Sequence, residues 1–294
     1  MTTSIHRNYI GGEWVEGPRT GQNINPSDTD DVIGAYTRAD AKQAEQAIDA
    51  AFDVRGVWER WTAEQRADAL DRVGTELLAR CEALGELLSR EEGKTRGEGV
   101  AEAVRAGRIF KFFAGEALRV SGEKLPVIRP CVDVEVTREP EGVVGIITPW
   151  NFPLAIPAWK IAPALAYGNT VVFKPADLVP GSAWALAEII VRAGKLPAGV
   201  FNLVMGPGSS VGQAIAASRK VRAVSFTGSV DTGRHLGVTC VQRGAKVQME
   251  MGGKNPLVIL DDANLDVAVS VAIQGSFYST GQRCTGSSRL VVQE

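Results

Sequence analysis

The stretch VVGIITPWNFP, residues 143–153, decides the fold class. It begins as a run of β-branched and other apolar residues, which is typical of a buried strand. Pro149 and Pro153 follow at once, and proline fixes φ and stops strands. Because a helical segment starts directly afterwards, at Ala155, the stretch predicts the first strand–helix unit of an α/β protein.

Outward from this stretch, short β-branched runs alternate with helical segments. The runs predict strands at Val143–Thr148, Thr170–Lys174, Phe201–Met205, Ala223–Thr227, Lys246–Met249 and Leu257–Leu260. The segments between them predict helices at Ala155–Tyr167, Pro180–Ala193, Ser209–Ala217, Ser229–Arg243 and Leu265–Ser279. Such alternation predicts a parallel sheet covered by helices on both faces. Ligands of these sheets bind at the carboxyl ends of the strands.

The part of the chain before this alternation is helical in character. It predicts helices at Ala41–Phe52, with Asp40 as the N-cap, at Thr62–Arg80 and at Val100–Leu118. Thr62 precedes Gln65 by three residues, which is a capping-box signature. Residues 131–138 then alternate between apolar and polar, as a two-sided or edge strand does.

Composition excludes several classes of protein. The 294 residues are 45% hydrophobic and 22% charged, which is typical of a folded globular chain. The 32 basic and 34 acidic residues leave a net charge of −2, so no basic excess indicates a nucleic-acid or membrane partner. With only His6 and His235, a His-based triad or a multi-His metal site is nearly excluded, and we expect no metal.

The sequence also predicts a reducing compartment. The start has no apolar stretch of the kind found in secretory signals, and no apolar run is long enough to span a bilayer. Four cysteines in a chain of this size do not form a disulfide framework. We therefore expect a cytoplasmic protein.

Side chains that could act in catalysis or ligand binding follow two of the predicted strands. Asn151 follows the first strand, and its side-chain amide would serve as a hydrogen-bond donor to an oxyanion. The alternative is that Pro149 and Pro153 make this stretch a rigid turn with no catalytic role. Lys174 and Asp177 end the second strand, where an ammonium and a carboxylate suit the hydroxyls of a nucleotide ribose. The alternative for this pair is a weak surface ion pair.

Two glycine-rich turns also follow strands and open helices. Residues 206–212 resemble the dinucleotide-binding fingerprint, with one residue too many before the last glycine. Residues 226–233 would let backbone approach a phosphate at a helix N-terminus. Either turn alone is equally compatible with ordinary strand–helix connections.

The last two candidates are a carboxylate and a thiol. Glu250 ends a predicted strand and is followed by two glycines, so it is either a general base or a solvated loop residue. Cys284 lies in a polar, glycine-flanked stretch beside Arg283, and a neighbouring cation favours the nucleophilic thiolate. The other three cysteines lie in predicted helices or on the alternating strand and fit buried structural roles.

Taken together, these segments resemble the aldehyde dehydrogenase superfamily. The motifs that carry the resemblance occur in the family's order and spacing, and they are PWNFP (149–153), KP (174–175), FTGS (226–229), EMGGK (250–254) and GQRC (281–284). The resemblance covers the whole chain, including YIGGEW (9–14). Within the family, residues 173–193 and 278–290 are most similar to α-ketoglutarate semialdehyde dehydrogenases.

The resemblance implies a role for each matching residue. Cys284 resembles the nucleophile that adds to the aldehyde, Asn151 the side-chain donor to the oxyanion, and Glu250 the base that activates water. The cofactor is expected to be NAD or NADP, and Asp177 favours NAD because its carboxylate repels a 2′-phosphate. The residues implied in cofactor binding are Ile147, Thr148, Pro149, Trp150, Lys174, Asp177, Gly208, Phe226, Gly228, Ser229 and Gly233.

The resemblance also divides the chain. It implies an N-terminal helical part of the cofactor domain (1–119), a β oligomerisation arm (120–140), a doubly wound, Rossmann-like cofactor-binding core (141–250) and the start of a second, catalytic α/β domain (251–294). The family continues well beyond position 294, so we expect that residues 251–294 are too few to bury a core of their own. With that further part present, a homodimer or homotetramer is expected.

The expected function is oxidation of an aldehyde, a semialdehyde of a dicarboxylic acid such as α-ketoglutarate semialdehyde, to the carboxylate. The alternatives within the class are succinate semialdehyde, betaine aldehyde and general aldehyde dehydrogenases. A non-catalytic nucleotide-binding fragment and a cysteine-dependent acyl hydrolase remain as alternatives from other classes.

Overall fold

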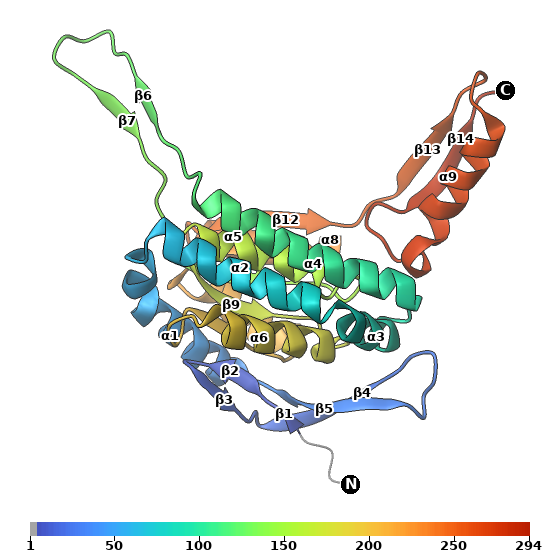
Figure 1. Ribbon diagram of the computed structural model, residues 1–294, viewed down its shortest axis with the longest axis horizontal. Helices are drawn as coiled ribbons and strands as arrows, with labels where there is room; N and C mark the ends of the chain where they lie inside the picture. Colours follow the sequence, from blue (N-terminus) through green and yellow to red (C-terminus); the bar gives the residue numbers. More distant parts are fainter. Residues whose placement is uncertain (1–4) are drawn as a thin grey trace.

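A seven-stranded sheet forms the centre of the computed structural model, which describes residues 5–294 (Figure 1). Its strand order is β12-β11-β8-β9-β10-β2-β3. The five strands from β12 to β10 are parallel, and the β2–β3 hairpin continues the sheet in antiparallel orientation at one edge. These strands are β2 (Asn8–Ile10), β3 (Glu13–Val15), β8 (Val143–Ile147), β9 (Thr170–Lys174), β10 (Phe201–Leu203), β11 (Val221–Gly228) and β12 (Lys246–Met251).

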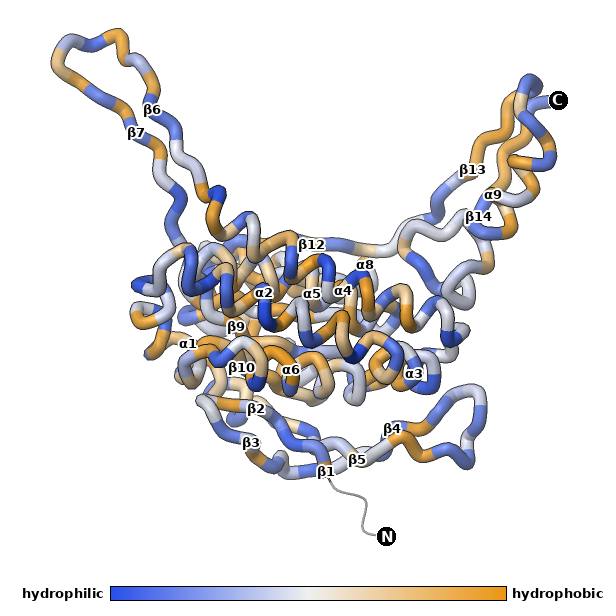
Figure 2. The backbone as a smooth tube through the Cα atoms, viewed as in Figure 1, coloured by the Kyte–Doolittle hydropathy of each residue, from blue (hydrophilic) through white to orange (hydrophobic). Residues whose placement is uncertain are grey.

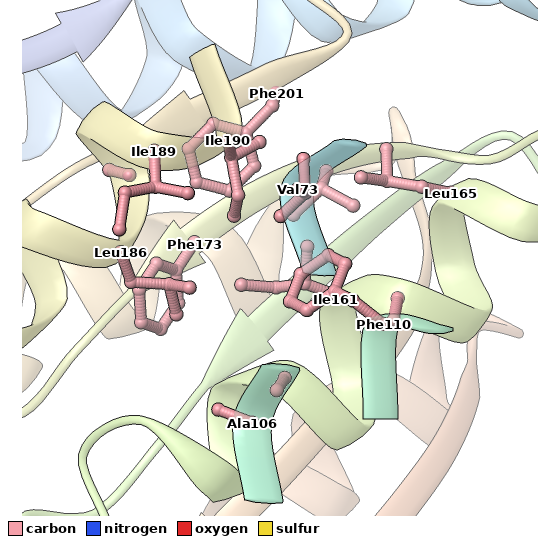
Figure 3. Close-up of a cluster of buried hydrophobic side chains, with 14 of the residues drawn as sticks. Val73, Ala106, Phe110, Ile161, Leu165, Phe173, Leu186, Ile189, Ile190 and Phe201 are labelled. Atoms are coloured by element: carbon pink, nitrogen blue, oxygen red, sulfur yellow. The ribbon is translucent and has the colours of Figure 1, made fainter. Parts of the chain in front are cut away.

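Helices cover both faces of the sheet, which confirms the predicted α/β architecture. Strand β9 shows why: Val171 and Phe173 pack into one apolar cluster, and Val172 between them packs into another. Figure 3 shows the first cluster, where Phe173 and Phe201 of the sheet meet side chains of α2, α4, α5 and α6. The helices of that face are α2 (Ala63–Ala79), α3 (Cys81–Glu92), α4 (Arg96–Ala117), α5 (Ala155–Ala166) and α6 (Pro180–Gly194), and those of the other are α1 (Ala41–Glu59), α7 (Gln213–Ala217) and α8 (Val230–Gln242).

The strand order reverses once, beside β8. The chain runs outward from β8 through β9 to β10, then returns to the opposite side of β8 to form β11 and β12. In doubly wound sheets, this reversal opens a crevice at the carboxyl ends of the two strands that flank it. Here the crevice lies between the ends of β8, at Ile147, and β11, at Gly228.

Caps explain where the helices start. Asp40 accepts a hydrogen bond from the Gln43 amide at 2.9 Å, and the predicted capping box of Thr62 and Gln65 is formed. Helix α4 begins four residues before the predicted Val100, because Thr95 and Glu98 form a second capping box. The helix predicted at Thr62–Arg80 matches α2, but no helix was predicted over the range of α3, which ends where Gly93 takes a left-handed conformation.

The five N-terminal strands were not predicted. Besides β2 and β3 they are β1 (Ile5–His6), β4 (Arg19–Ile24) and β5 (Val32–Arg38), which form a separate three-stranded sheet with order β1-β5-β4. Within the part predicted as helical (1–119), strands therefore precede the first helix, and residues 1–4 lie outside the described part. Strand β4, with sequence RTGQNI, carries no apolar run and little burial, so its pairing with β5 rather than its composition makes it a strand.

Two segments project from this body (Figure 1). One is the hairpin of β6 (Glu123–Leu125) and β7 (Val134–Val136), within the expected arm. The other contains the parallel pair β13 (Asn255–Ile259) and β14 (Ser287–Val292) with helix α9 (Leu265–Phe277) and the short helix η2 (Tyr278–Gly281). Both expose apolar side chains, and no residue of α9 is buried. Figure 2 shows hydrophobic positions along both projecting segments. Between residues 5 and 294, no helix is both long and apolar enough to cross a membrane.

Candidate active site

The side chain of Asn151 lies against the loop that carries Cys284. Asn151 sits in the turn between β8 and α5, and its Nδ2 donates to the main-chain oxygen of Gln282 at 2.7 Å. Its Oδ1 is buried and accepts no hydrogen bond within the described part of the chain. The structure therefore brings together the predicted oxyanion donor and the predicted nucleophile loop, which are far apart in the sequence.

The main chain at Cys284 is held in place from β13. The Nδ2 of Asn255 donates to the carbonyl oxygens of Cys284 at 2.7 Å and of Gly286 at 3.2 Å. The thiol itself is exposed, and it lines two neighbouring cavities. The sequence analysis gave Asn255 no role, although it directly follows the EMGGK motif.

Glu250 shares the first of these cavities, of about 600 Å³, with Cys284. One carboxylate oxygen of Glu250 accepts from Gln248 Nε2 at 2.9 Å. Buried Lys160 lines the same cavity and donates to Ser225 Oγ at 2.8 Å and to Gln248 Oε1 at 3.0 Å. Burial lowers the pKa of Lys160 to about 8, although nearby Glu250 raises it.

The second cavity at Cys284, of about 320 Å³, is lined by aromatic side chains and by charged side chains of both signs. Phe152, Trp159 and Tyr278 line it, together with Arg105 and Arg283. The Arg283 guanidinium donates to main-chain oxygens of α9, at 2.9 Å in the shorter bond, and lies over the Tyr278 ring. Arg105 lies over the Trp159 ring at 4.6 Å and forms no ion pair among residues 5–294, although the carboxylates of Glu98 and Glu102 line the same cavity.

The crevice at the strand reversal has the features of a nucleotide site. Ile147 at the end of β8, Gly208 and the first turn of α8 enclose a cavity of about 420 Å³. Gly208 begins a single π-helical turn, η1 (Gly208–Gly212), and a Cβ there would meet no atom within 4 Å, so the backbone is open to a ligand. Ser229 caps α8 by accepting from Thr232 N. Exposed N–H groups at such a helix start suit a phosphate.

The glycines of the second turn pack on Phe226. A Cβ at Gly228 would lie 2.5 Å from Phe226 Cζ, and one at Gly233 would lie 2.6 Å from Met251 Sδ. The Phe226 side chain is buried beside both glycines, and the predicted cofactor contact at Phe226 stays a prediction. At Gly233 the contact reflects the close approach of α8 to β12, whereas at Gly228 the Phe226 ring fills the adjacent space.

Lys174 and Asp177 lie together at the end of β9. Buried Lys174 donates to the Pro175 oxygen at 2.7 Å, and its Nζ is 4.0 Å from the Asp177 carboxylate. Burial lowers the pKa of Lys174, and Asp177 raises it. Thr148 connects this strand to β8, because its amide donates to the Lys174 oxygen at 3.2 Å. Pro149 and Trp150 follow in the turn that carries Asn151.

Known proteins similar to this chain belong to one family. The sequence profile of the aldehyde dehydrogenase family matches residues 14–294. The chain belongs to the aldehyde dehydrogenase family. It is 44% identical over 293 residues to the alpha-ketoglutaric semialdehyde dehydrogenase of Bacillus subtilis, a match that covers 99% of this chain and 60% of that protein. The alpha-ketoglutarate semialdehyde dehydrogenase of Haloferax volcanii is 42% identical, with 99% and 61% covered.

Solved structures of family members superpose closely. Betaine aldehyde dehydrogenase from Staphylococcus aureus in complex with NAD+ gives a TM-score of 0.95 at 37% identity, covering 100% of this chain and 58% of that one. An NADP-dependent enzyme of Escherichia coli gives 0.95 at 38% identity, covering 98% and 60%. This aldehyde dehydrogenase chain thus spans about 60% of the length of the curated relatives it matches. Among residues 5–294, no group of three or more His, Cys, Asp or Glu side chains is arranged to hold a metal ion.

Proposed function

We propose that this aldehyde dehydrogenase chain oxidises an aldehyde to the carboxylate with NAD(P), through a covalent intermediate on Cys284. The observation that carries the proposal is the convergence of three separate segments at the Cys284 loop. Asn151 is hydrogen-bonded to the Cys284 loop, and Glu250 lines a cavity with Cys284. Family membership supports the same assignment.

In the proposed mechanism, the Cys284 thiolate forms a C–S bond to the aldehyde carbon, and the carbonyl π electrons move to oxygen. Asn151 Nδ2, which has a second N–H besides the one bound to Gln282, and the Cys284 amide stabilise this oxyanion. Loss of a hydride from this carbon to NAD(P), the electron acceptor that Lys174, Asp177 and the start of α8 would hold, would leave a thioester on Cys284. Glu250 then removes a proton from water, the water oxygen adds to the thioester carbon, and the C–S bond breaks to release the carboxylate and the thiolate.

The residues at the strand ends fit a dinucleotide. Lys174 and Asp177 would hold the adenosine ribose, Gly208 would border the adenine, and the start of α8 would lie near the pyrophosphate. The carboxylate of Asp177 would repel a 2′-phosphate, so we propose NAD as the preferred cofactor. The similar proteins differ in cofactor, because the S. aureus structure holds NAD+ and the E. coli enzyme is described as NADP-dependent.

The proposed substrate is a semialdehyde of a dicarboxylic acid, such as α-ketoglutarate semialdehyde. The cavity beside Cys284 supports this, because its three cationic side chains outnumber its two carboxylates, and the Arg105 guanidinium, which forms no ion pair among residues 5–294, would attract a substrate carboxylate and repel the cation of betaine aldehyde. The relatives from B. subtilis and H. volcanii act on the same substrate by name. We propose that the exposed β6–β7 arm and α9 are association surfaces. With the rest of the family's catalytic domain present, they would take part in a homodimer or homotetramer.

The test is a substrate panel with NAD+ or NADP+, in which reduced cofactor is followed at fixed enzyme concentration. We expect kcat/KM to be highest for α-ketoglutarate semialdehyde, ahead of succinate semialdehyde, betaine aldehyde and a simple aliphatic aldehyde. Arg105→Ala should lower kcat/KM for the acidic aldehydes about tenfold or more and leave the aliphatic aldehyde unchanged. Arg108→Ala, on the same helix and exposed outside the cavity, is the control. Equal losses for acidic and neutral aldehydes would contradict the proposed substrate class.

A further inference from the structure

Three charged residues at the start of α4 contact both catalytic loops. Lys94 directly precedes the capping residue Thr95, and Glu98 and Glu102 follow at intervals of four residues. Residues four apart in a helix lie on the same face, so Glu98 and Glu102 point in one direction. All three line the smaller of the two cavities that contain Cys284, the one of about 320 Å³.

Lys94 and Glu102 form a buried ion pair beneath the Asn151 turn. Their side chains are 1% and 3% exposed, and Lys94 Nζ lies 2.5 Å from Glu102 Oε2. Lys94 also donates to the main-chain oxygen of Asn151 at 2.7 Å and lies over the Phe152 ring at 3.8 Å. One ammonium therefore fixes two consecutive residues of the turn, including the one that carries the oxyanion amide.

Glu102 also supplies the cap that α5 lacks. The N-cap residue of α5 is Leu154, which has no side-chain acceptor. Glu102 Oε1 accepts from the amides of Leu154 at 3.0 Å and Ala155 at 3.1 Å. A carboxylate at a helix N-terminus satisfies free N–H groups and interacts favourably with the helix dipole, so this contact holds the end of the Asn151 turn.

Glu98 holds the other loop. Its Oε1 accepts from the amide of Ser279 at 2.8 Å, while Oε2 accepts from the Thr95 amide at 3.1 Å. Ser279 and Thr280 have φ of 55° and 57°, the left-handed region that residues other than glycine rarely occupy. Such backbone persists only where the surroundings fix it, and the Glu98 contact does so five residues before Cys284.

We propose that Lys94, Glu98 and Glu102 act together as a positioning device, the α4 clamp, which holds the Asn151 turn and the Cys284 loop at one fixed separation. The clamp's effect on kcat rests on the proposed function, whereas its effect on loop order does not. None of the three residues forms a bond to substrate in this scheme, because each acts through the backbone of a loop.

The first test measures loop order by hydrogen exchange and mass spectrometry of peptides covering residues 278–286. Glu98→Ala should increase exchange in this segment about tenfold or more, because the Ser279 amide loses its acceptor. Glu98→Gln keeps an acceptor oxygen and should restore protection. Glu82→Ala, which breaks the exposed Arg96–Glu82 pair beside α4, should change nothing. Unchanged exchange in Glu98→Ala would overturn the clamp.

The second test separates positioning from a merely structural role. In Glu98→Ala and in Glu102→Gln, kcat for the aldehyde should fall about tenfold or more, with KM for NAD+ within about twofold of wild type. Because Glu102→Gln removes part of a buried ion pair, its thermal unfolding is recorded to check that the variant is folded. Lys94→Arg serves as a second variant, which keeps the positive charge. If wild type shows no turnover, the proposed function fails and the exchange experiment alone decides on the clamp. Faster exchange in Glu98→Ala with unchanged kcat would overturn the positioning role.

Discussion

The side-chain nitrogen of Asn151 lies 2.7 Å from the main-chain oxygen of Gln282, so the turn after β8 is hydrogen-bonded to the loop that carries Cys284. This contact joins the end of a strand of the central sheet to the projecting C-terminal segment at the position of the proposed chemistry. Asn151 is thus both a candidate oxyanion donor and a part of the connection between the two loops.

Replacing Asn151 should therefore affect the chemical step most. We expect Asn151→Ala to lower kcat about 100-fold, because an oxyanion donor acts mainly in the transition state. KM for NAD+ should stay within about twofold of wild type. Steady-state kinetics with saturating aldehyde measures both values. Asn264→Ala, at the exposed start of α9, is the control, and a rise in KM with unchanged kcat would argue against the oxyanion role.

Glu250→Gln should uncouple the two halves of the reaction. The amide cannot remove a proton from water, so the thioester should form normally and hydrolyse about 100-fold more slowly. Stopped-flow absorbance should then show a burst of reduced cofactor, equal in amount to the enzyme, followed by slow turnover. Glu135→Gln, on the exposed arm, should show no such change. Loss of the burst itself would mean that Glu250 acts before hydride transfer.

Asp177→Ser should shift the cofactor preference toward NADP. Removing the carboxylate 4.0 Å from Lys174 leaves that ammonium free to attract a 2′-phosphate. We expect the ratio of kcat/KM for NADP+ to that for NAD+ to rise about tenfold or more. Asp261→Ser, distant from β9 in the projecting segment, should leave this ratio unchanged. An unchanged ratio in Asp177→Ser would place cofactor selection elsewhere.

Glu92 should make the free energy of unfolding depend on pH. Its carboxylate is buried, and neither oxygen has a hydrogen-bond partner in the described residues. Burial raises the pKa of Glu92 to about 7 from 4.5. Between these values the folded chain keeps a proton that the unfolded chain has lost, so this stabilising contribution is complete below pH 4.5 and is lost as pH rises through 7.

Glu92→Gln removes that titration. Relative to the variant, wild type should lose about 2 kcal/mol of unfolding free energy between pH 5 and pH 8. Urea denaturation at the two pH values measures this difference, and Glu86→Gln on the exposed side of the same helix is the control. If wild type instead gains unfolding free energy relative to Glu92→Gln between pH 5 and pH 8, Glu92 is ionised in the folded chain.

The local signals in the sequence were sufficient for the five parallel strands of the central sheet and for most of the helices around them, but not for β14. Strand β8 and its turn are defined by an apolar run that stops at Pro149, and Thr170–Lys174 forms a strand with the predicted bounds. Local patterns do not encode which strands become neighbours. Strand β11 pairs with β8 through Phe226 and Ile147, and β2 pairs with β10 through Tyr9 and Leu203, contacts that join distant parts of the chain.

The same limit applies to the candidate site. Asn151, Glu250 and Cys284 could be selected because each stands in a recognisable motif. Lys94, Glu98 and Glu102 resemble an ordinary charged face of a helix, and only the fold brings them to two loops that follow much later in the chain. Arg105 could not be selected from the sequence either, because its proposed role depends on the cavity it lines rather than on its neighbours in sequence.

The most direct measurement for the proposed oxidation is the mass of the peptide containing Cys284 after the chain is mixed with α-ketoglutarate semialdehyde. Glu250→Gln is used so that the thioester accumulates. We predict an acyl adduct on Cys284 in an amount equal to the reduced cofactor formed, only when NAD+ is present, and neither product in Cys284→Ala. Reduced cofactor formed by Cys284→Ala, or acylation of Cys284 from the aldehyde without any NAD+, would contradict the account.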